Sequence, residues 1–167
     1  MPKRSLCFII SPIGDEDSGV RDHADTVIEK LIEPALRLVH EKSGKAGPRM
    51  EAVRADHEHD AGNIMERVVR RILNDDVVIA VLFDRRANVY YELGIAHSAG
   101  RKVVLLRRAD EKLPFDIGQD NSITYAPRHL KETGEAEQKE IVHRLAEAIE
   151  RRVDLSLASL RGGAETC

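Results

Sequence analysis

The sequence lacks three features that would each point to a particular class of protein. It has only two cysteines in 167 residues, Cys7 and Cys167, at opposite ends of the chain, so neither a disulfide framework nor a paired-cysteine metal site is expected. Its net charge of -3 provides no basic excess of the kind that neutralises nucleic-acid phosphates. No apolar run reaches the length of a signal-peptide core or a membrane span. We therefore predict a cytoplasmic protein that binds neither membranes nor nucleic acids and uses no metal or other cofactor.

The order of apolar segments predicts a single α/β domain over residues 1–153, followed by a C-terminal tail over residues 154–167. Compact apolar runs at residues 6–10, 77–83 and 102–106 suit strands that are covered on both faces. Weaker strands are expected at residues 50–53 and 122–125. Apolar residues that recur every three or four positions predict four helices, over residues 22–40, 61–73, 88–100 and 135–153. Pro34 should kink or split the first of them.

This alternation of strands and helices predicts a flavodoxin-like, or Rossmann-like, three-layer sandwich. Its five-stranded, mostly parallel sheet should have the strand order 2-1-3-4-5. Strands one and three then lie side by side at the point where the winding direction reverses, and open parallel sheets bind ligands outside the carboxyl ends of such strands. The loop over residues 11–15 and the segment over residues 85–92 should meet there.

Glu92 is the carboxylate expected at this edge, near the start of the helix that follows the central strand. Asn88 is placed to cap that helix, and the backbone N–H groups of the first turn would favour the glutamate anion. A carboxylate there can act as a nucleophile toward an oxocarbenium-like carbon. The alternative is a glutamate that only stabilises its own helix.

Further candidate residues lie on the neighbouring loops. Gly14 would let the backbone approach a ligand, and the Ser11 hydroxyl can bind phosphate or ribose, although an ordinary Pro-Gly turn explains the same residues. Arg21 is placed to bind a phosphate through its guanidinium fork, with Arg85 and Arg86 as alternatives. The full set of predicted substrate-binding residues is Ser11, Pro12, Ile13, Gly14, Asp15, Arg21, Asp56, Asn88, Tyr91 and Asp116.

A run of acidic and histidine residues, Asp-His-Glu-His-Asp at residues 56–60, follows the second strand. Its spacing fits no helical ligand pattern, so we expect a solvated loop or helix cap rather than a metal site. Asp56 is placed to hydrogen-bond a ribose hydroxyl.

Four segments together resemble a bacterial group related to nucleoside 2-deoxyribosyltransferases. They read Phe-Ile-Ile-Ser-Pro-Ile-Gly at 8–14, Asn-Val-Tyr-Tyr-Glu-Leu-Gly-Ile-Ala-His at 88–97, Leu-Pro-Phe-Asp-Ile at 113–117 and Ile-Thr-Tyr at 123–125. This superfamily neighbours the nucleotide N-glycosidases and the TIR-like nucleotide-binding domains. The resemblance implies cleavage of an N-glycosidic bond, with Glu92 as a nucleophile that forms a glycosyl ester. Nearby carboxylates and tyrosines would hold the sugar and help to protonate the leaving base.

The strand before Glu92 departs from this pattern. Relatives usually read Ala-Asp-Leu-Thr, whereas this chain has Val81 in place of the aspartate and Phe83 in place of the threonine. Asp84 is the candidate to supply the missing carboxylate. The departures favour an alternative function, a TIR-like module that binds a nucleotide or NAD in a bacterial defence or stress pathway, or one that hydrolyses NAD. A flavodoxin-like interaction domain with a vestigial pocket is the third possibility.

Self-association is a further expectation, by analogy with related sheets that pair around the site. His97, five residues after Glu92, should point away from it. The candidate surface for a homodimer or a higher homo-oligomer consists of His97, Ser98 and the last helix.

Overall fold

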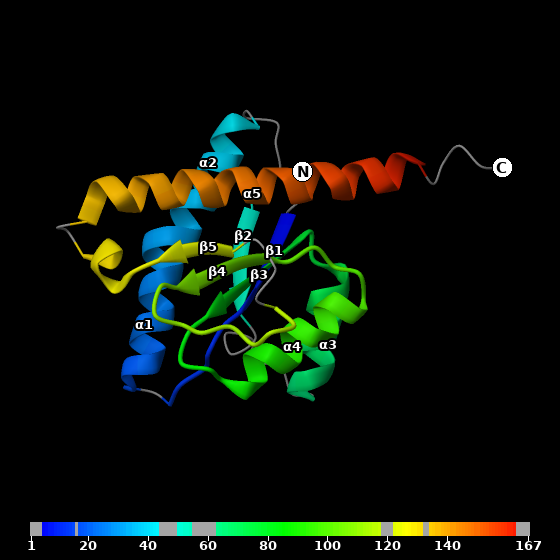
Figure 1. Ribbon diagram of the computed structural model, residues 1–167. Coiled ribbons are helices and arrows are strands. Elements are labelled where there is room, and N and C mark those ends of the chain that lie inside the picture. Colours follow the sequence, from blue (N-terminus) through cyan, green and yellow to red (C-terminus); the bar gives the residue numbers. More distant parts are fainter. Residues whose placement is uncertain are drawn as a thin grey trace.

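A five-stranded parallel sheet forms the centre of the molecule (Figure 1). The computed structural model describes residues 5–15, 17–43, 50–54, 63–117, 122–131 and 134–162, the last nine of these by their backbone alone. The strand order is β2-β1-β3-β4-β5, and every neighbouring pair is parallel, which confirms the predicted fold and strand order. The strands are β1 Ser5–Ile10, β2 Met50–Arg54, β3 Val77–Leu82, β4 Val104–Arg108 and β5 Ser122–Tyr125.

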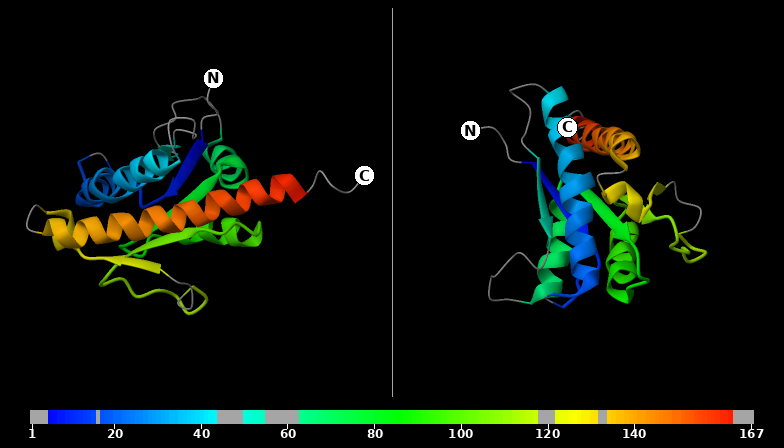
Figure 2. Two further views of the ribbon diagram at one scale, coloured as in Figure 1. Left: turned by 90° about the horizontal axis from the view of Figure 1, so that it is seen from above. Right: turned by 90° about the vertical axis from the view of Figure 1, so that its left-hand side faces the viewer.

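Helices cover both faces of the sheet and so complete a three-layer sandwich (Figure 2). One layer consists of α1 Gly19–Val27, the π-helical turn η1 Ile28–Ile32, α2 Glu33–Lys42 and α5 Glu135–Gly162. The other consists of α3 Ile64–Asn74 and α4 Ala87–Ser98. Successive residues of β3 alternate between the two apolar clusters, because neighbouring side chains of a strand point to opposite faces. This explains why the central strand is apolar throughout.

The predicted interruption at Pro34 is present as a change of helix type. The residues from Ile28 to Ile32 form a π-helical turn, and α2 begins at Glu33 with the proline in its first turn. Proline has no N–H to donate and its ring crowds the carbonyl four residues earlier. A widened π turn is a common way to accommodate such a break in the ladder.

The last helix is longer than predicted. It continues from Glu135 to Gly162, nine residues beyond Val153, so most of the expected C-terminal tail belongs to α5. Its buried stripe includes Ile141, Leu145 and Ile149, which pack on the sheet and on α2. None of the described helices has the length and hydropathy required to span a membrane.

Candidate active site

The topological switch point lies between β1 and β3. These strands pair in parallel with Cys7 opposite Val77 and Ile10 opposite Ala80, so their carboxyl ends are at the same edge of the sheet. The loop that begins at Ser11 and the connection that begins at Phe83 both leave the sheet there. Helix α4 follows this connection and packs against both strands, so its first turn is near the predicted ligand edge.

Glu92 lies on the buried face of α4. The helix also buries Val89, Leu93 and Ala96, whose spacing of three and four residues places them on the same side as Glu92. Only 8% of the Glu92 surface is exposed, and within the described part of the chain no group donates a hydrogen bond to its carboxylate. Burial raises the pKa of this carboxyl to about 7, because the charged form loses its hydration. Near neutral pH, Glu92 is therefore ionised in some molecules and protonated in others.

The start of α4 differs from the prediction in a way that explains this pKa. The helix begins at Ala87 with Arg86 as its N-cap residue, and no side chain caps it, so Asn88 lies within the first turn instead of capping. Counting from Ala87, Glu92 is the sixth residue of the helix, and dipole effects fade beyond the first turn. Desolvation thus outweighs the stabilisation that was expected for the anion.

The raised pKa of Glu92 should make the folded protein less stable as the pH rises. Well below the ordinary value of 4.5, the carboxyl is protonated in both the folded and the unfolded chain. Between 4.5 and about 7 the unfolded chain releases a proton that the folded chain still holds, so the free energy of unfolding falls. We expect a loss of roughly 3 kcal/mol by about pH 8 that the Glu92→Gln protein does not show. Urea denaturation of both proteins across this range measures it, and parallel stability curves would contradict a desolvated carboxyl.

The loop after β1 combines buried and exposed candidate residues. Ser11 is 3% exposed, and its hydroxyl has no hydrogen-bond partner among the described residues. Pro12 is also buried, whereas Ile13 and Asp15 are exposed. The Arg21 guanidinium lies 3.5 Å from the Gly14 carbonyl oxygen. The structure thus brings Arg21 to this loop and leaves one buried hydroxyl there for a further partner.

A side chain at Gly14 would collide with the residue that caps α1. The Ser18 hydroxyl accepts a hydrogen bond from the Arg21 N–H and caps α1, and a Cβ on Gly14 would lie 2.1 Å from that hydroxyl oxygen. Gly14→Ala should therefore displace Ser18 from its cap and lower the free energy of unfolding by roughly 1 to 2 kcal/mol. In a Ser18→Ala background the same substitution should cost less, because the clashing atom is gone. Thermal denaturation of the four proteins measures this coupling, and strictly additive losses would refute the clash.

The connection from β3 to α4 is held in an unusual backbone conformation. Asp84 and Arg85 have φ angles of 59° and 42°, in the left-handed region that non-glycine residues seldom adopt. Asp84 is exposed, and its carboxylate lies 2.7 Å from Nε of Arg86. The carboxylate proposed as a substitute for the missing aspartate is therefore already engaged in an ion pair.

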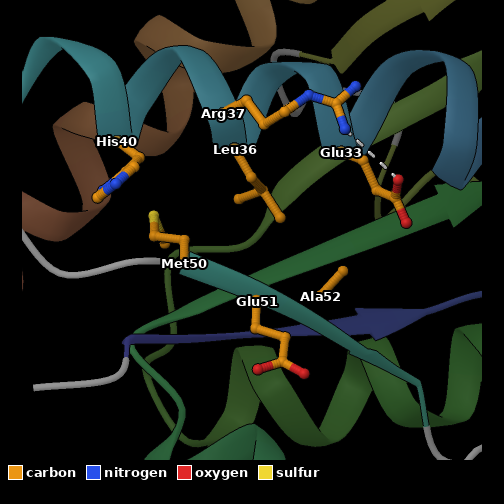
Figure 3. Close-up of a pocket in the computed structure, with 7 residues that line it drawn as sticks. All are labelled: Glu33, Leu36, Arg37, His40, Met50, Glu51 and Ala52. Carbon is orange, nitrogen blue, oxygen red and sulfur yellow. Dashed lines mark ion pairs between the residues drawn. The ribbon is translucent and has the colours of Figure 1, made fainter.

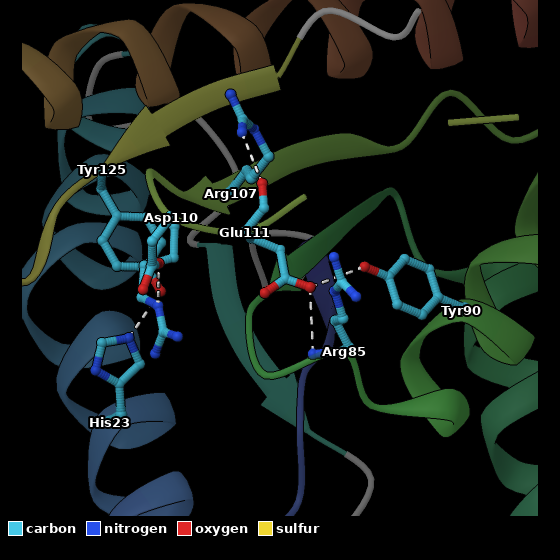
Figure 4. A network of polar contacts seen from close by, with 8 residues as sticks. His23, Arg85, Tyr90, Arg107, Asp110, Glu111 and Tyr125 are labelled. Carbon is cyan, nitrogen blue, oxygen red and sulfur yellow. Dashed lines mark hydrogen bonds and ion pairs between the residues drawn. The ribbon is translucent and has the colours of Figure 1, made fainter. Parts of the chain in front are cut away.

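Glu111, which was not among the predicted site residues, binds this connection from the loop after β4 (Figure 4). It is 5% exposed, and its Oε1 accepts hydrogen bonds from the Arg85 N–H and the Tyr90 hydroxyl, each at 3.2 Å. Burial and the Glu111 charge raise the pKa of Tyr90 to about 12, so the phenol keeps its proton. Arg107 donates to the Glu111 carbonyl at 2.9 Å. In the sequence, Asp-Glu-Lys at residues 110–112 looks like a solvated turn and gives no sign of this role.

Two further polar side chains, His23 and Tyr125, form a pair at the carboxyl ends of the strands, on the face of the sheet that α1 covers. Nε2 of His23 on α1 is hydrogen-bonded to the hydroxyl of Tyr125 at the end of β5, at 2.9 Å. The His23 ring also packs edge-on against Phe83, with 4.5 Å between ring centroids. Burial, with the nearby Arg108 guanidinium, lowers the pKa of His23. The imidazole therefore stays neutral at neutral pH and can offer one donor and one acceptor.

The two departures, Val81 on β3 and Phe83 directly after it, belong to the apolar core. Val81 is fully buried and Phe83 is 2% exposed, and both lie in the cluster on the α1–α5 face. The Arg108 guanidinium lies 5.6 Å from the centroid of the Phe83 ring. At these two positions, where the resembled pattern has an aspartate and a threonine, the side chains fill the apolar core and supply no polar group to the site.

The remaining predicted residues are not all brought together. Asn88 and Tyr91 are exposed on α4, with Tyr91 at 63%. Asp116 lies elsewhere, since it lines a cavity with His97 and Lys102 at the amino end of β4. Asp56 and the rest of residues 56–60 lie outside the described residues. Among the residues that are described, no group of three histidine, cysteine or acidic side chains is arranged to hold a metal ion.

Comparison with known proteins supports the fold. No family model and no curated protein matches the chain. Among solved structures, the X-ray structure of an oxidoreductase from Corynebacterium diphtheriae aligns over 92% of this chain and 98% of its own, with a TM-score of 0.58 and 12% sequence identity. Similarity at this level of identity shows a shared architecture alone.

Proposed function

We propose that this protein cleaves the N-glycosidic bond of a nucleoside or nucleotide, with Glu92 as the nucleophile. The observation that carries the proposal is a desolvated carboxylate, without a hydrogen-bond donor among the described residues, on the helix that packs against β1 and β3. Buried carboxyls with strongly perturbed pKa values are concentrated at functional sites. The resemblance of residues 88–97 to nucleoside 2-deoxyribosyltransferases supports the reaction class.

The reaction has two displacements at the anomeric carbon. A Glu92 carboxylate oxygen forms a bond to C1′ while the C1′–N bond breaks, and the electron pair of that bond stays on the base nitrogen, which takes up a proton. Water, or a second base in a transfer reaction, then attacks C1′ and releases the carboxylate. Because the nucleophile is the ionised form and the pKa of Glu92 is about 7, about half of the molecules are competent near neutral pH.

The loop after β1 offers groups for the rest of the substrate. The buried Ser11 hydroxyl has no partner among the described residues, and a sugar hydroxyl or phosphate oxygen would satisfy it. The Arg21 guanidinium, directed toward the Gly14 carbonyl, is the group we assign to a phosphate. This assignment favours a nucleotide over a nucleoside.

A second function, binding without turnover, is favoured by the residues at the end of β3 and directly after it. Glycosidases use a pair of carboxylates, whereas Val81 and Phe83 are apolar and buried and Asp84 is paired with Arg86. A TIR-like module that recognises a nucleotide or NAD would need no second carboxylate. The same edge of the sheet would then serve for recognition alone.

An assay with a substrate panel separates these functions. The protein is incubated with nucleosides, nucleoside monophosphates and NAD, and free base is measured by liquid chromatography while binding is measured by calorimetry. Release of base from a nucleoside or monophosphate supports the glycosidase. Binding of the same compounds without release supports the module, and release of nicotinamide alone supports an NAD hydrolase.

A further inference from the structure

A group of basic residues lies at the opposite edge of the sheet from Glu92. Arg101 and Lys102 precede β4, and Arg144, Arg151 and Arg152 come from α5. On α5 the three arginines are spaced by seven and eight residues, which places them on one face of the helix. We call these five residues the basic groove.

Two adjoining cavities make this surface concave. One, of about 490 Å³, is lined by Arg101, Lys102 and Arg152, and the other, of about 510 Å³, by Arg144, Arg151 and Arg152. They share Leu105 and Arg152, so Arg152 stands between them. Each volume is within the range of small-molecule sites, roughly 300 to 1,000 Å³.

Among the described residues, few acidic groups lie beside the cations of the groove. Lys102, Arg144, Arg151 and Arg152 make no ion pair within the part of the chain that the structure describes, and Nε of Arg152 is buried without an acceptor. Burial, and then the charge of Arg151, lower the pKa of Arg152. Among the described residues that line the two cavities, only Asp116 and Glu147 carry negative charge. The described lining of the groove thus has five cationic and two acidic side chains, although the whole chain has a net charge of -3.

Another cavity shows that this imbalance is not general. A hollow of about 430 Å³ between α2 and the start of β2 contains Glu33 and Glu51 as well as Arg37 and His40 (Figure 3). Arg37 pairs there with Glu33 at 3.8 Å. Elsewhere, the buried Arg54 guanidinium lies 2.7 Å from the Asp25 carboxylate. The groove differs from both because its guanidinium groups have no carboxylate partner among the described residues.

We propose that the basic groove binds a small molecule that carries two or more phosphoryl groups. Guanidinium forks match phosphate oxygens bidentately, and an acceptor there would satisfy the buried Nε of Arg152. Val103, Leu105 and Ile123 provide an apolar floor beside the cations, which would suit the organic part of a phosphorylated ligand. The groove is at the amino ends of β4 and β5, so it is separate from the Glu92 site and does not depend on its proposed chemistry.

Titration with tripolyphosphate tests this proposal. Calorimetry at constant ionic strength compares the wild type with the triple variant Arg144→Gln/Arg151→Gln/Arg152→Gln. The matched control is Arg128→Gln/Lys131→Gln/Lys139→Gln, which removes the same charge from exposed positions outside the groove. We expect the wild type and the control to bind alike and the groove variant to bind at least tenfold more weakly. Equal affinity in the two triple variants, or no binding by the wild type, would overturn the proposal.

Backbone NMR of the unmodified protein keeps the test independent of how the variants fold. Tripolyphosphate should shift the amide signals of Leu105, Ser122 and residues near Arg152, with little change around Ser11 and Glu92. Shifts confined to the carboxyl ends of β1 and β3 would place the phosphate in the candidate active site and refute a separate groove. Repeating the titration with a nucleoside triphosphate shows whether the organic part adds affinity over the apolar floor.

Discussion

Replacing Glu92 by glutamine should abolish the release of base while the protein remains folded. The amide has nearly the shape of the carboxyl but cannot form the glycosyl ester, so the rate should fall roughly 10³-fold or more. The folded state should not suffer, because glutamine carries no charge to be buried and Glu92 accepts no hydrogen bond from the described residues. The rate of base release and the circular dichroism spectrum of the variant measure the two effects.

The matched control for this prediction is Glu66→Gln. Glu66 is exposed on α3 and forms an exposed ion pair with Arg70 at 3.5 Å, which contributes little to stability. This variant should release base at the wild-type rate. A Glu92→Gln protein that is as active as the Glu66→Gln protein would exclude Glu92 as the nucleophile.

Glu111→Ala should have the largest effect on stability of the substitutions considered, roughly 3 kcal/mol. The substitution removes the acceptor for both the Arg85 N–H and the Tyr90 hydroxyl, and each buried donor left without a partner costs about 1 to 3 kcal/mol. Arg85 would also lose the hydrogen bond that holds its left-handed conformation. Chemical denaturation measures the loss in the free energy of unfolding.

Two further measurements show whether the loss in stability comes from the missing hydrogen bonds of Glu111 or from the cavity that alanine leaves. Glu111→Gln keeps an oxygen acceptor and should lose only about 1 kcal/mol. Ultraviolet titration should show that the pKa of Tyr90 falls in both variants, since the Glu111 charge contributes to its rise to about 12. If alanine and glutamine destabilise the protein equally, the carboxylate does not hold the connection in the way described.

The sheet was predictable because its strands carry their own signals. The central strand of residues 77–82 is apolar at every position, which is the pattern of a strand buried on both faces. Helical segments between the strands indicate parallel crossovers, and five strands connected in this way fit the 2-1-3-4-5 order. The packing of α4, which carries Glu92, against β1 and β3 follows from that order and from its place after the third strand.

The electrostatics of the site were not predictable, because they depend on contacts between residues distant in sequence. The N-terminal position of Glu92 on its helix indicated a favoured anion, whereas the burial of α4 reverses the sign of the effect on its pKa. Glu111 is 26 residues from the Arg85 N–H that it binds, and nothing in a short acidic turn reveals that contact. The place of Asp116 depends on how the loop after β4 returns toward the amino end of the sheet.

Covalent trapping at Glu92 tests the central claim most directly. A 2′-fluorinated nucleoside or nucleoside monophosphate slows breakdown of a glycosyl ester, because fluorine destabilises the positive charge that develops at C1′. We predict that the intact mass of the wild type increases by one fluorinated sugar unit, that peptide mapping places it on Glu92, and that the Glu92→Gln protein gains nothing. Release of base without any adduct, or an adduct on another residue, would contradict the account.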